Sequence, residues 1–243
     1  MGIDFVLFDL YGTLVDINVD QESPGFWEAL GQNLEKRGIR ADASQLRETF
    51  IESLNHERSR LPDGFVMERV LENVLQKLDG VPSREEVEAF AGVFRGLSVV
   101  NLSLREYTEP LLKALRRSGC KTGIVSNTEA ILTRVDLRRL PQLEDVDVTV
   151  LSSDVGAKKP GRQIFEIALE RLGARAETGI FVGDNFQEDV IGASSLGIRA
   201  VYLQNDDEPQ KSVSLAVPAV AVAMPELASL GEALQSLGWQ GRV

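Results

Sequence analysis

The chain has little of several residue types, and each shortage narrows what it can be. Its 243 residues include one cysteine, Cys120, which excludes an intrachain disulfide and suits the reducing cytoplasm. The single histidine, His56, lies in a polar stretch, and we assign it no chemistry. No apolar run approaches the roughly 20 residues of a membrane-spanning helix, and no basic region precedes an apolar one at the start. We therefore expect neither a membrane segment nor a signal peptide.

Positive charge is also scarce. The chain has 26 Lys and Arg against 37 Asp and Glu, which gives a formal net charge of −11 at pH 7. An acidic chain is attracted neither to nucleic acid nor to an anionic membrane surface. We therefore expect a small-molecule substrate, no nucleic-acid or membrane partner, and a monomer or homodimer.

Short apolar segments are what the chain has in abundance. Segments rich in β-branched residues have the pattern of parallel strands buried on both faces, at 3–9, 121–126, 146–151, 179–183 and 199–203, with a weaker one at 219–223. Helical patterns accompany them at 108–118, 128–140, 161–173, 187–196 and 225–237. Strands that alternate with helices predict an α/β fold with a doubly wound parallel sheet.

Residues 17–100 interrupt this alternation. They show no convincing strand, and they contain four amphipathic helical patterns, at 24–38, 43–60, 63–79 and 83–97. The sequence therefore predicts a core formed by 1–16 and 101–243. An all-helical domain, 17–100, would be inserted after the first strand as a cap over the ligand crevice.

The first strand ends in an acid, a glycine and a hydroxyl: Asp9, Gly12 and Thr13. In open α/β sheets, ligands bind at the carboxyl ends of the strands, so Asp9 is a candidate nucleophile. Gly12 allows a sharp turn, and the hydroxyl of Thr13 can bind an anion. An aspartate that only caps the next turn is the structural alternative.

Two further segments put polar groups at the same edge of the sheet. Ser126 and Asn127 follow the strand at 121–126, where a hydroxyl and main-chain N–H groups can bind an anion, or where Asn127 can simply cap a helix. Lys159 precedes a proline and a helix, and its ammonium can neutralise an aspartate or a phosphoryl oxygen. The alternative for Lys159 is a solvated loop lysine.

The fourth segment contains two acids. Asp184 ends the strand at 179–183, and Asp189 follows in the first turn of the next helix. Carboxylates at a strand end and a helix start can converge on one divalent cation, and oxygen ligands are those that Mg²⁺ prefers. A turn aspartate and a helix-dipole aspartate are the structural alternatives.

Together these four segments resemble the motifs of the haloacid dehalogenase-like hydrolase superfamily, in the right order from Asp9 to Asp189, with a helical cap inserted after the first motif. The resemblance implies a Rossmann-like core and a covalent attack by Asp9. It implies that Lys159 orients the nucleophile and that Thr13, Ser126 and the Asn127 main chain hold the transferring group. It further implies a Mg²⁺ cofactor bound by Asp9, the Tyr11 carbonyl and Asp184, with Asp189 supporting the metal or Lys159.

Tyr11 departs from the phosphatases of this superfamily, which usually have an aspartate there that protonates the leaving group. Enzymes that remove halide from 2-haloacids resemble this chain at Tyr11, but they need no metal and lack the Gly183-Asp184 pair. We therefore expect a magnesium-dependent phosphatase of a small phosphorylated metabolite, acting through an aspartyl-phosphate intermediate. The alternatives are a 2-haloacid dehalogenase and a phosphate-binding pseudo-enzyme. In similar capped enzymes the turn that holds Arg40 approaches the active site, so Arg40 is a candidate substrate ligand.

Overall fold

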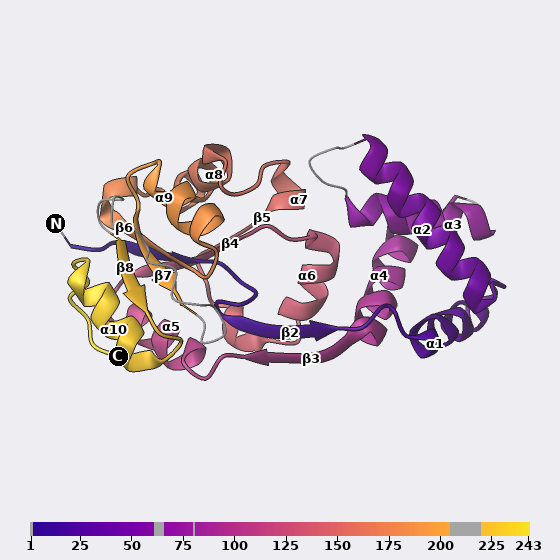
Figure 1. Cartoon of the computed structure of the whole chain (residues 1–243), viewed down its shortest axis with the longest axis horizontal. Helices are drawn as coiled ribbons and strands as arrows, with labels where there is room; N and C mark the ends of the chain where they lie inside the picture. The colour runs from indigo at the N-terminus through magenta and orange to yellow at the C-terminus, as the bar shows by residue number, and fades with distance from the viewer. Residues whose placement is uncertain (1, 61–65, 80, 205–219) are drawn as a thin grey trace. The chain divides into compact units, whose positions relative to one another are not determined.

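The computed structural model describes residues 2–60, 66–79, 81–204 and 220–243 (Figure 1). The chain divides into two compact units. The first, here called the α/β unit, comprises Met1–Asp16, Ser103–Thr128 and Leu140–Val243. The second, the helical unit, comprises Ile17–Leu102 and Glu129–Arg139.

The α/β unit is built on a parallel sheet. Within the described residues the sheet has six strands in the order β5-β4-β1-β6-β7-β8. The strands are β1 (Phe5–Phe8), β4 (Lys121–Ser126), β5 (Val148–Leu151), β6 (Gly179–Gly183), β7 (Arg199–Leu203) and β8 (Val220–Ala223). With β1 central and the later strands added on both sides, this order is that of the Rossmann fold. The predicted doubly wound sheet is confirmed, and residue 219 of the expected last strand lies outside the described residues.

Helices cover both faces of this sheet. In Figure 1, α8 (Arg162–Leu172) and α9 (Gly192–Ser194) lie on one side, and α5 (Thr108–Arg117) and α10 (Leu227–Ser236) lie on the other. The short α7 (Ser152–Val155) follows β5. Phe5 and Leu7 of β1 pack with Phe165 of α8 and Phe181 of β6 in one fully buried cluster. A strand buried on both faces needs apolar residues on both, which is why β1 reads Phe-Val-Leu-Phe.

Two expected helices differ in detail. The segment predicted as a helix over 187–196 contains a π-helical segment, Phe186–Ile191, followed by α9. Asn185 caps the start of the π-helical segment. Its side chain accepts hydrogen bonds from the main-chain N–H groups of Gln187 and Glu188. The last helix, expected from Pro225, begins at Leu227.

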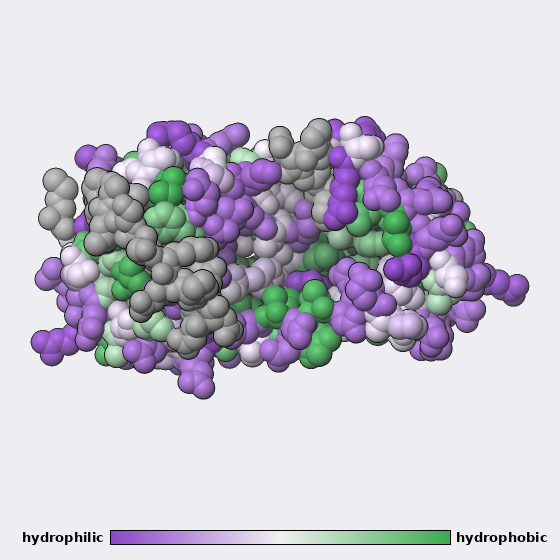
Figure 2. Space-filling model, viewed as in Figure 1, coloured by the Kyte–Doolittle hydropathy of each residue, from purple (hydrophilic) through white to green (hydrophobic). Residues whose placement is uncertain are grey.

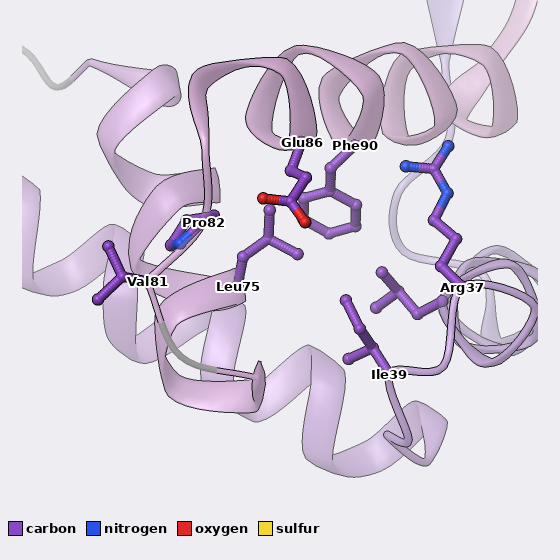
Figure 3. Close-up of a pocket in the computed structure, with 8 residues that line it drawn as sticks. Arg37, Ile39, Leu75, Val81, Pro82, Glu86 and Phe90 are labelled. Carbon is purple, nitrogen blue, oxygen red and sulfur yellow. The ribbon is translucent and has the colours of Figure 1, made fainter.

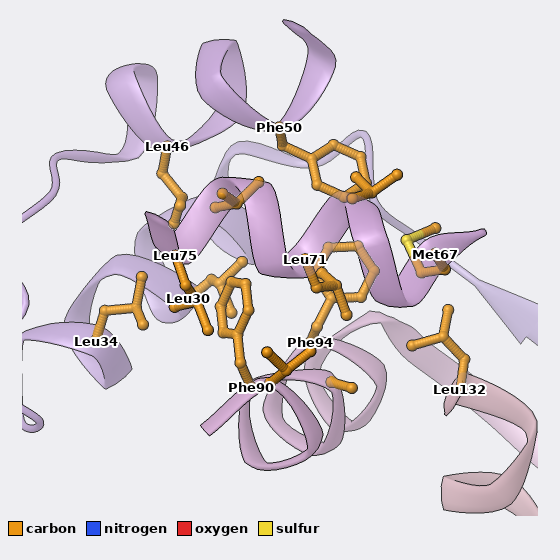
Figure 4. Close-up of a cluster of buried hydrophobic side chains, with 14 of the residues drawn as sticks. Leu30, Leu34, Leu46, Phe50, Met67, Leu71, Leu75, Phe90, Phe94 and Leu132 are labelled. Carbon is orange, nitrogen blue, oxygen red and sulfur yellow. The ribbon is translucent and has the colours of Figure 1, made fainter. Parts of the chain in front are cut away.

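The helical unit contains α1 (Pro24–Glu35), α2 (Ala43–Arg60), α3 (Met67–Asp79), α4 (Arg84–Ser98) and α6 (Ala130–Leu137). Their apolar faces meet in one cluster (Figure 4). The ring of Phe94 is central to it, since it stacks on Phe50 and meets Phe26 edge-on, each at 5.2 Å between centroids. Leu132 of α6 belongs to the same cluster, so α6 packs with the inserted helices although its sequence lies between β4 and β5.

The boundaries at 16/17 and 100/101, and the role of the helical block as a cap over the crevice, stay predictions. The expected start of the third helix, 63–65, lies outside the described residues. None of the helices in the described part of the chain is both long enough and apolar enough to cross a membrane.

The expectation that 17–100 contains no strand was wrong. β2 (Val15–Val19) and β3 (Val99–Leu104) form a two-stranded sheet through which the chain enters and leaves the inserted segment. Both alternate apolar and polar residues, as half-exposed strands do, and therefore lack the continuous apolar run of the core strands. The surface over β2 and β3 shows a hydrophobic area in Figure 2. Val100 of β3 is 66% exposed.

A cavity of about 90 Å³ lies within the helical unit (Figure 3). Its lining is Leu34, Arg37, Ile39, Leu75, Val81, Pro82, Glu86 and Phe90. The Glu86 carboxylate accepts a hydrogen bond from the Ser83 N–H at 2.6 Å and completes a capping box at the start of α4. Because the Glu86 carboxylate already caps α4, we assign this cavity no catalytic role.

Candidate active site

Asp9 lies one residue beyond β1, at the carboxyl edge of the sheet. Phe8 pairs with Ile124 of β4 and with Val182 of β6, and the Asp9 N–H donates to the Val182 carbonyl at 2.9 Å. This register brings the ends of β4 and β6 beside the acid. The sequence placed a candidate nucleophile here, and the structure brings the polar ends of the neighbouring strands to it.

Both hydrogen bonds to the Asp9 side chain fall on one oxygen. Oδ1 accepts from the Ser126 hydroxyl at 3.0 Å and from the Lys159 ammonium at 2.5 Å, and the side chain is largely buried. Oδ2 accepts none from the described residues. A carboxylate held by one oxygen keeps the other available for attack.

Lys159 is a buried ammonium between two carboxylates. Its Nζ lies 2.5 Å from Asp9 Oδ1 and 2.6 Å from Asp189 Oδ1, and the residue is 2% exposed. Burial by itself lowers the pKa of Lys159, but the charges of Asp9 and Asp189 together outweigh it and raise that pKa. Lys159 is therefore a fixed cation in the site, and the alternative of a solvated loop lysine is wrong.

Three carboxylates gather around this single cation. One oxygen each of Asp9, Asp184 and Asp189 lie within 4.8 Å of one another. Burial and then the negative charge of Asp9 raise the pKa of Asp184, and burial raises the pKa of Asp189 to about 7. The donors are hard oxygens that lie close together, and such a set fits a bound divalent cation.

The contacts of the two later acids differ. Asp189 uses both oxygens, Oδ1 for Lys159 and Oδ2 for the Asn185 N–H at 2.9 Å. Asp184 accepts the Thr13 hydroxyl at 3.4 Å, and its side chain is only partly buried. Asp189 therefore has both oxygens in use, and one of them holds Lys159.

Two glycines are required by these acids. A Cβ on Gly12, whose φ is +82°, would lie 2.2 Å from Asp184 Oδ2. A Cβ on Gly183 would lie 2.2 Å from Asp189 Oδ2. Any side chain at either position would displace a carboxylate, which explains the Gly-Thr and Gly-Asp pairs in the sequence.

The turn after Asp9 is anchored from a distant helix. The Tyr107 hydroxyl donates to the Thr13 carbonyl, and the Thr108 hydroxyl donates to the Leu14 carbonyl at 2.7 Å. Tyr107 is buried, and burial raises the pKa of its phenol. Tyr11, within the turn, is partly exposed and forms an isolated bridge with Val15. Sequence reasoning missed Tyr107 and Thr108 because no motif marks them.

Asn127 contributes its side chain as well as its position. Its Oδ1 accepts the Lys159 N–H at 2.8 Å, and its Nδ2 donates to the Lys159 carbonyl at 2.9 Å and to Glu188 Oε2 at 3.0 Å. The helix-capping alternative for Asn127 is wrong, since these contacts account for its amide. Glu188 was also missed by sequence reasoning.

Arg40 belongs to the helical unit, whereas the cluster of acids belongs to the α/β unit. It lies exposed between α1 and α2 in the helical unit, so its contact with substrate stays a prediction. His56 is exposed on α2.

The geometry agrees with comparisons to known proteins. The model of the haloacid dehalogenase-like hydrolases matches residues 3–197, and the chain belongs to this family. A glyceraldehyde 3-phosphate phosphatase of Methanothermobacter thermautotrophicus is 35% identical over 99 residues, which are 41% of this chain and 44% of that protein. The chain thus spans less than half the length of this relative.

Two solved structures extend the likeness to nearly the whole chain. A phosphatase of this family from Thermococcus onnurineus has a TM-score of 0.60 at 25% identity, over 99% of this chain and 100% of that one. A 2-haloacid dehalogenase from Pseudomonas syringae has a TM-score of 0.63 at 24% identity, over 96% and 99%. The second likeness establishes the fold alone.

Proposed function

We propose that this protein is a magnesium-dependent phosphatase of a small phosphorylated metabolite. The observation that carries the proposal is the gathering of three acids, Asp9, Asp184 and Asp189, whose carboxylate oxygens lie within 4.8 Å of one another. Metal-independent dehalogenases resemble this chain without the Gly183-Asp184 pair, and so without an acid at the position of Asp184. The names of the phosphatase relatives support the same reaction.

In the proposed reaction, Asp9 Oδ2 attacks phosphorus, and the bond from phosphorus to the leaving oxygen breaks. Lys159 holds Oδ1 and keeps the nucleophile oriented, and Ser126 donates to the same oxygen. Water then attacks the phosphorus of the aspartyl phosphate, which releases inorganic phosphate and a proton and restores the Asp9 carboxylate.

Asp9, Asp184 and the main chain at Tyr11 would hold the Mg²⁺. When bound, it supplies positive charge that stabilises the phosphoryl oxygens during transfer. Asp189 would act through Lys159, because both of its oxygens are used by Lys159 and Asn185.

Tyr11 bears on the substrate. Without a carboxyl group two residues after Asp9, the leaving oxygen departs without that proton donor, which typically contributes 10²–10⁴-fold. Such a site favours acyl and aryl phosphates over alkyl phosphates. We further propose that the protein acts in the cytoplasm as a monomer or homodimer. The buried free thiol of Cys120 supports the reducing compartment.

One experiment separates the candidate reactions. The protein is assayed with p-nitrophenyl phosphate and with 2-chloropropionate, each with Mg²⁺ and with excess EDTA. Phosphate release that needs Mg²⁺ is the expected result. Chloride release in EDTA would replace the proposal with a 2-haloacid dehalogenase, the reading that Tyr11 favours. Phosphate binding with no turnover of either compound would indicate a pseudo-enzyme.

A further inference from the structure

Lys159 needs support beyond its two carboxylates. It lies in the connection between α7 and α8, outside any helix or strand. Regular secondary structure therefore does not fix its main chain, although its ammonium must stay within 2.6 Å of both Asp9 and Asp189. A shift of the Lys159 backbone would move the ammonium away from the nucleophile.

The side chain of Asn127 provides this support. It grips one residue at both main-chain groups, by accepting the Lys159 N–H at 2.8 Å and donating to the Lys159 carbonyl at 2.9 Å. The amide orientation follows from these partners, because only Oδ1 can accept from an N–H and only Nδ2 can donate to a carbonyl. Asn127 comes directly after Ser126, so the end of β4 contacts both Asp9 and the residue that orients it.

Glu188 in turn fixes the amide of Asn127. Its Oε2 accepts the second hydrogen of Asn127 Nδ2 at 3.0 Å. The neighbouring Asp189 accepts the Lys159 ammonium, so two consecutive residues of one π-helical segment reach Lys159 by different routes. Asp189 holds its charge, and Glu188 holds its backbone through Asn127.

We infer that Asn127 and Glu188 are positioning residues that hold Lys159 against Asp9. This role goes beyond the anion contact expected of the Asn127 main chain. The kinetic part of its test rests on the proposed phosphatase activity.

The kinetic test uses p-nitrophenyl phosphate with saturating Mg²⁺. Asn127→Ala should lower kcat by about 10- to 100-fold and leave KM within about threefold, because orientation is lost while the main-chain N–H remains. Glu188→Ala should lower kcat by about three- to tenfold. The control is Gln187→Ala, an exposed neighbour in the same segment whose side chain forms no hydrogen bond or ion pair among the described residues; its kcat should stay within about twofold.

The order of the contacts makes the two effects non-additive. In an Asn127→Ala background, Glu188→Ala should cost nothing further, because its only proposed route to Lys159 is gone. Asn127→Asp places two carboxylates face to face, and adding Glu188→Gln should then raise kcat by restoring a donor at this contact. An equal loss from Glu188→Ala in both backgrounds would overturn the inference, as would the absence of any rescue.

A spectroscopic measurement keeps this inference separate from the proposed function. In protein labelled with ¹⁵N-lysine, the buried Lys159 ammonium should give a signal that is lost in Lys159→Arg. That signal should shift or broaden in Asn127→Ala and in Glu188→Ala, but not in Gln187→Ala. Such a shift in a protein that hydrolyses no phosphate ester would overturn the function and retain the positioning role. An unchanged signal in both variants would overturn the positioning role at any measured rate.

Discussion

The two units bury charge in different ways. In the helical unit, Arg95 of α4 contacts both oxygens of Asp136 of α6, with the shortest distance 2.6 Å, and the buried Glu57 lies 3.9 Å from Arg60. Each of these acids has a cation of its own. The first pair joins two helices, and the second lies within α2.

In the α/β unit, three acids lie together. Oxygens of Asp9, Asp184 and Asp189 lie within 4.8 Å of one another, and the Lys159 ammonium contacts Asp9 and Asp189. Bringing carboxylates together in a buried place is costly, and a bound cation would lower that cost. The comparison teaches that the grouping of buried acids, more than their number, separates a structural ion pair from a candidate reaction site.

The largest expected effect comes from the centre of this cluster of acids. Asp9→Asn removes the attacking carboxylate, because an amide oxygen cannot replace it in covalent catalysis. Phosphate release should fall by more than about 100-fold. Steady-state kinetics measure the loss, and circular dichroism shows whether the fold is kept. A folded variant that retains more than about a hundredth of the rate would exclude Asp9 as nucleophile.

Asp184→Asn should lower activity nearly as much. It should also raise the stability of the metal-free protein. Losing a metal ligand should remove most of the rate and the Mg²⁺-dependent rise in melting temperature. Burial and the charge of Asp9 raise the pKa of Asp184, so its ionised form costs stability at neutral pH. The metal-free variant should therefore be more stable than the metal-free parent.

Thermal unfolding with and without Mg²⁺ measures both effects. Asp4→Asn, at an exposed aspartate outside the cluster, serves as the control. A destabilised metal-free Asp184→Asn protein would mean that Asp184 is structurally compensated, and the contrast between the units would fail.

Removing an acid from the Arg95–Asp136 pair of the helical unit should lower stability, in contrast to Asp184→Asn. Asp136→Asn leaves the Arg95 guanidinium buried without its carboxylate and should cost about 3–5 kcal/mol of unfolding free energy. Replacing both, as Arg95→Met with Asp136→Leu, should cost much less, because no charge remains. Urea unfolding measures each variant.

An exposed pair on the same helix gives the matched control. Arg84 and Glu88 of α4 lie 2.9 Å apart with side chains 81% and 55% exposed, so Arg84→Met should cost no more than about 1 kcal/mol. Equal losses from Arg84→Met and Asp136→Asn would show that burial does not distinguish the two pairs.

The sequence predicted the α/β unit better than its connections. The bounds of β4, β6 and β7 match the expected ones, because continuous apolar segments report burial on both faces. β2 and β3 carry an alternating pattern, but they are half-exposed and were not recognised. Alternation was the signal that could have found them.

The same limit applies to the site. Asp9, Lys159 and Asp189 were expected together, and both carboxylates contact the Lys159 ammonium. Tyr107 and Glu188 act on residues 94 and 61 positions away, and no local pattern encodes such a contact. Their roles follow only from the folded chain.

Tyr11→Asp tests whether the active site lacks a proton donor for the leaving group. An added carboxyl group two residues from Asp9 should donate a proton and speed alkyl phosphate hydrolysis by about 10²-fold at most, with little gain for aryl phosphates. The measurement is kcat/KM over a series of phosphate monoesters for both proteins. A wild-type rate that does not depend on the pKa of the leaving group would show that another acid already donates the proton.

The smallest expected effect belongs to an acid of the helical unit that has no ion pair among the described residues. Glu129 accepts one hydrogen bond, from the Met67 N–H at 2.7 Å, and burial raises its pKa. A raised folded pKa means that the native state holds the proton more tightly than the unfolded chain does. Glu129 therefore contributes stability below its unfolded pKa, near 4.5, that is lost as the pH rises through the folded pKa.

Glu129→Gln keeps an acceptor for the Met67 N–H and removes the charge. The variant should gain on the wild type as the pH rises from about 4 to 7, by a difference within about 1 kcal/mol. Urea unfolding across this range measures the difference, with exposed Glu144→Gln as the control. If the two proteins differ by the same amount at every pH, Glu129 does not titrate differently on folding. The helical unit would then accommodate an acid without a paired cation as readily as it accommodates Asp136 with one.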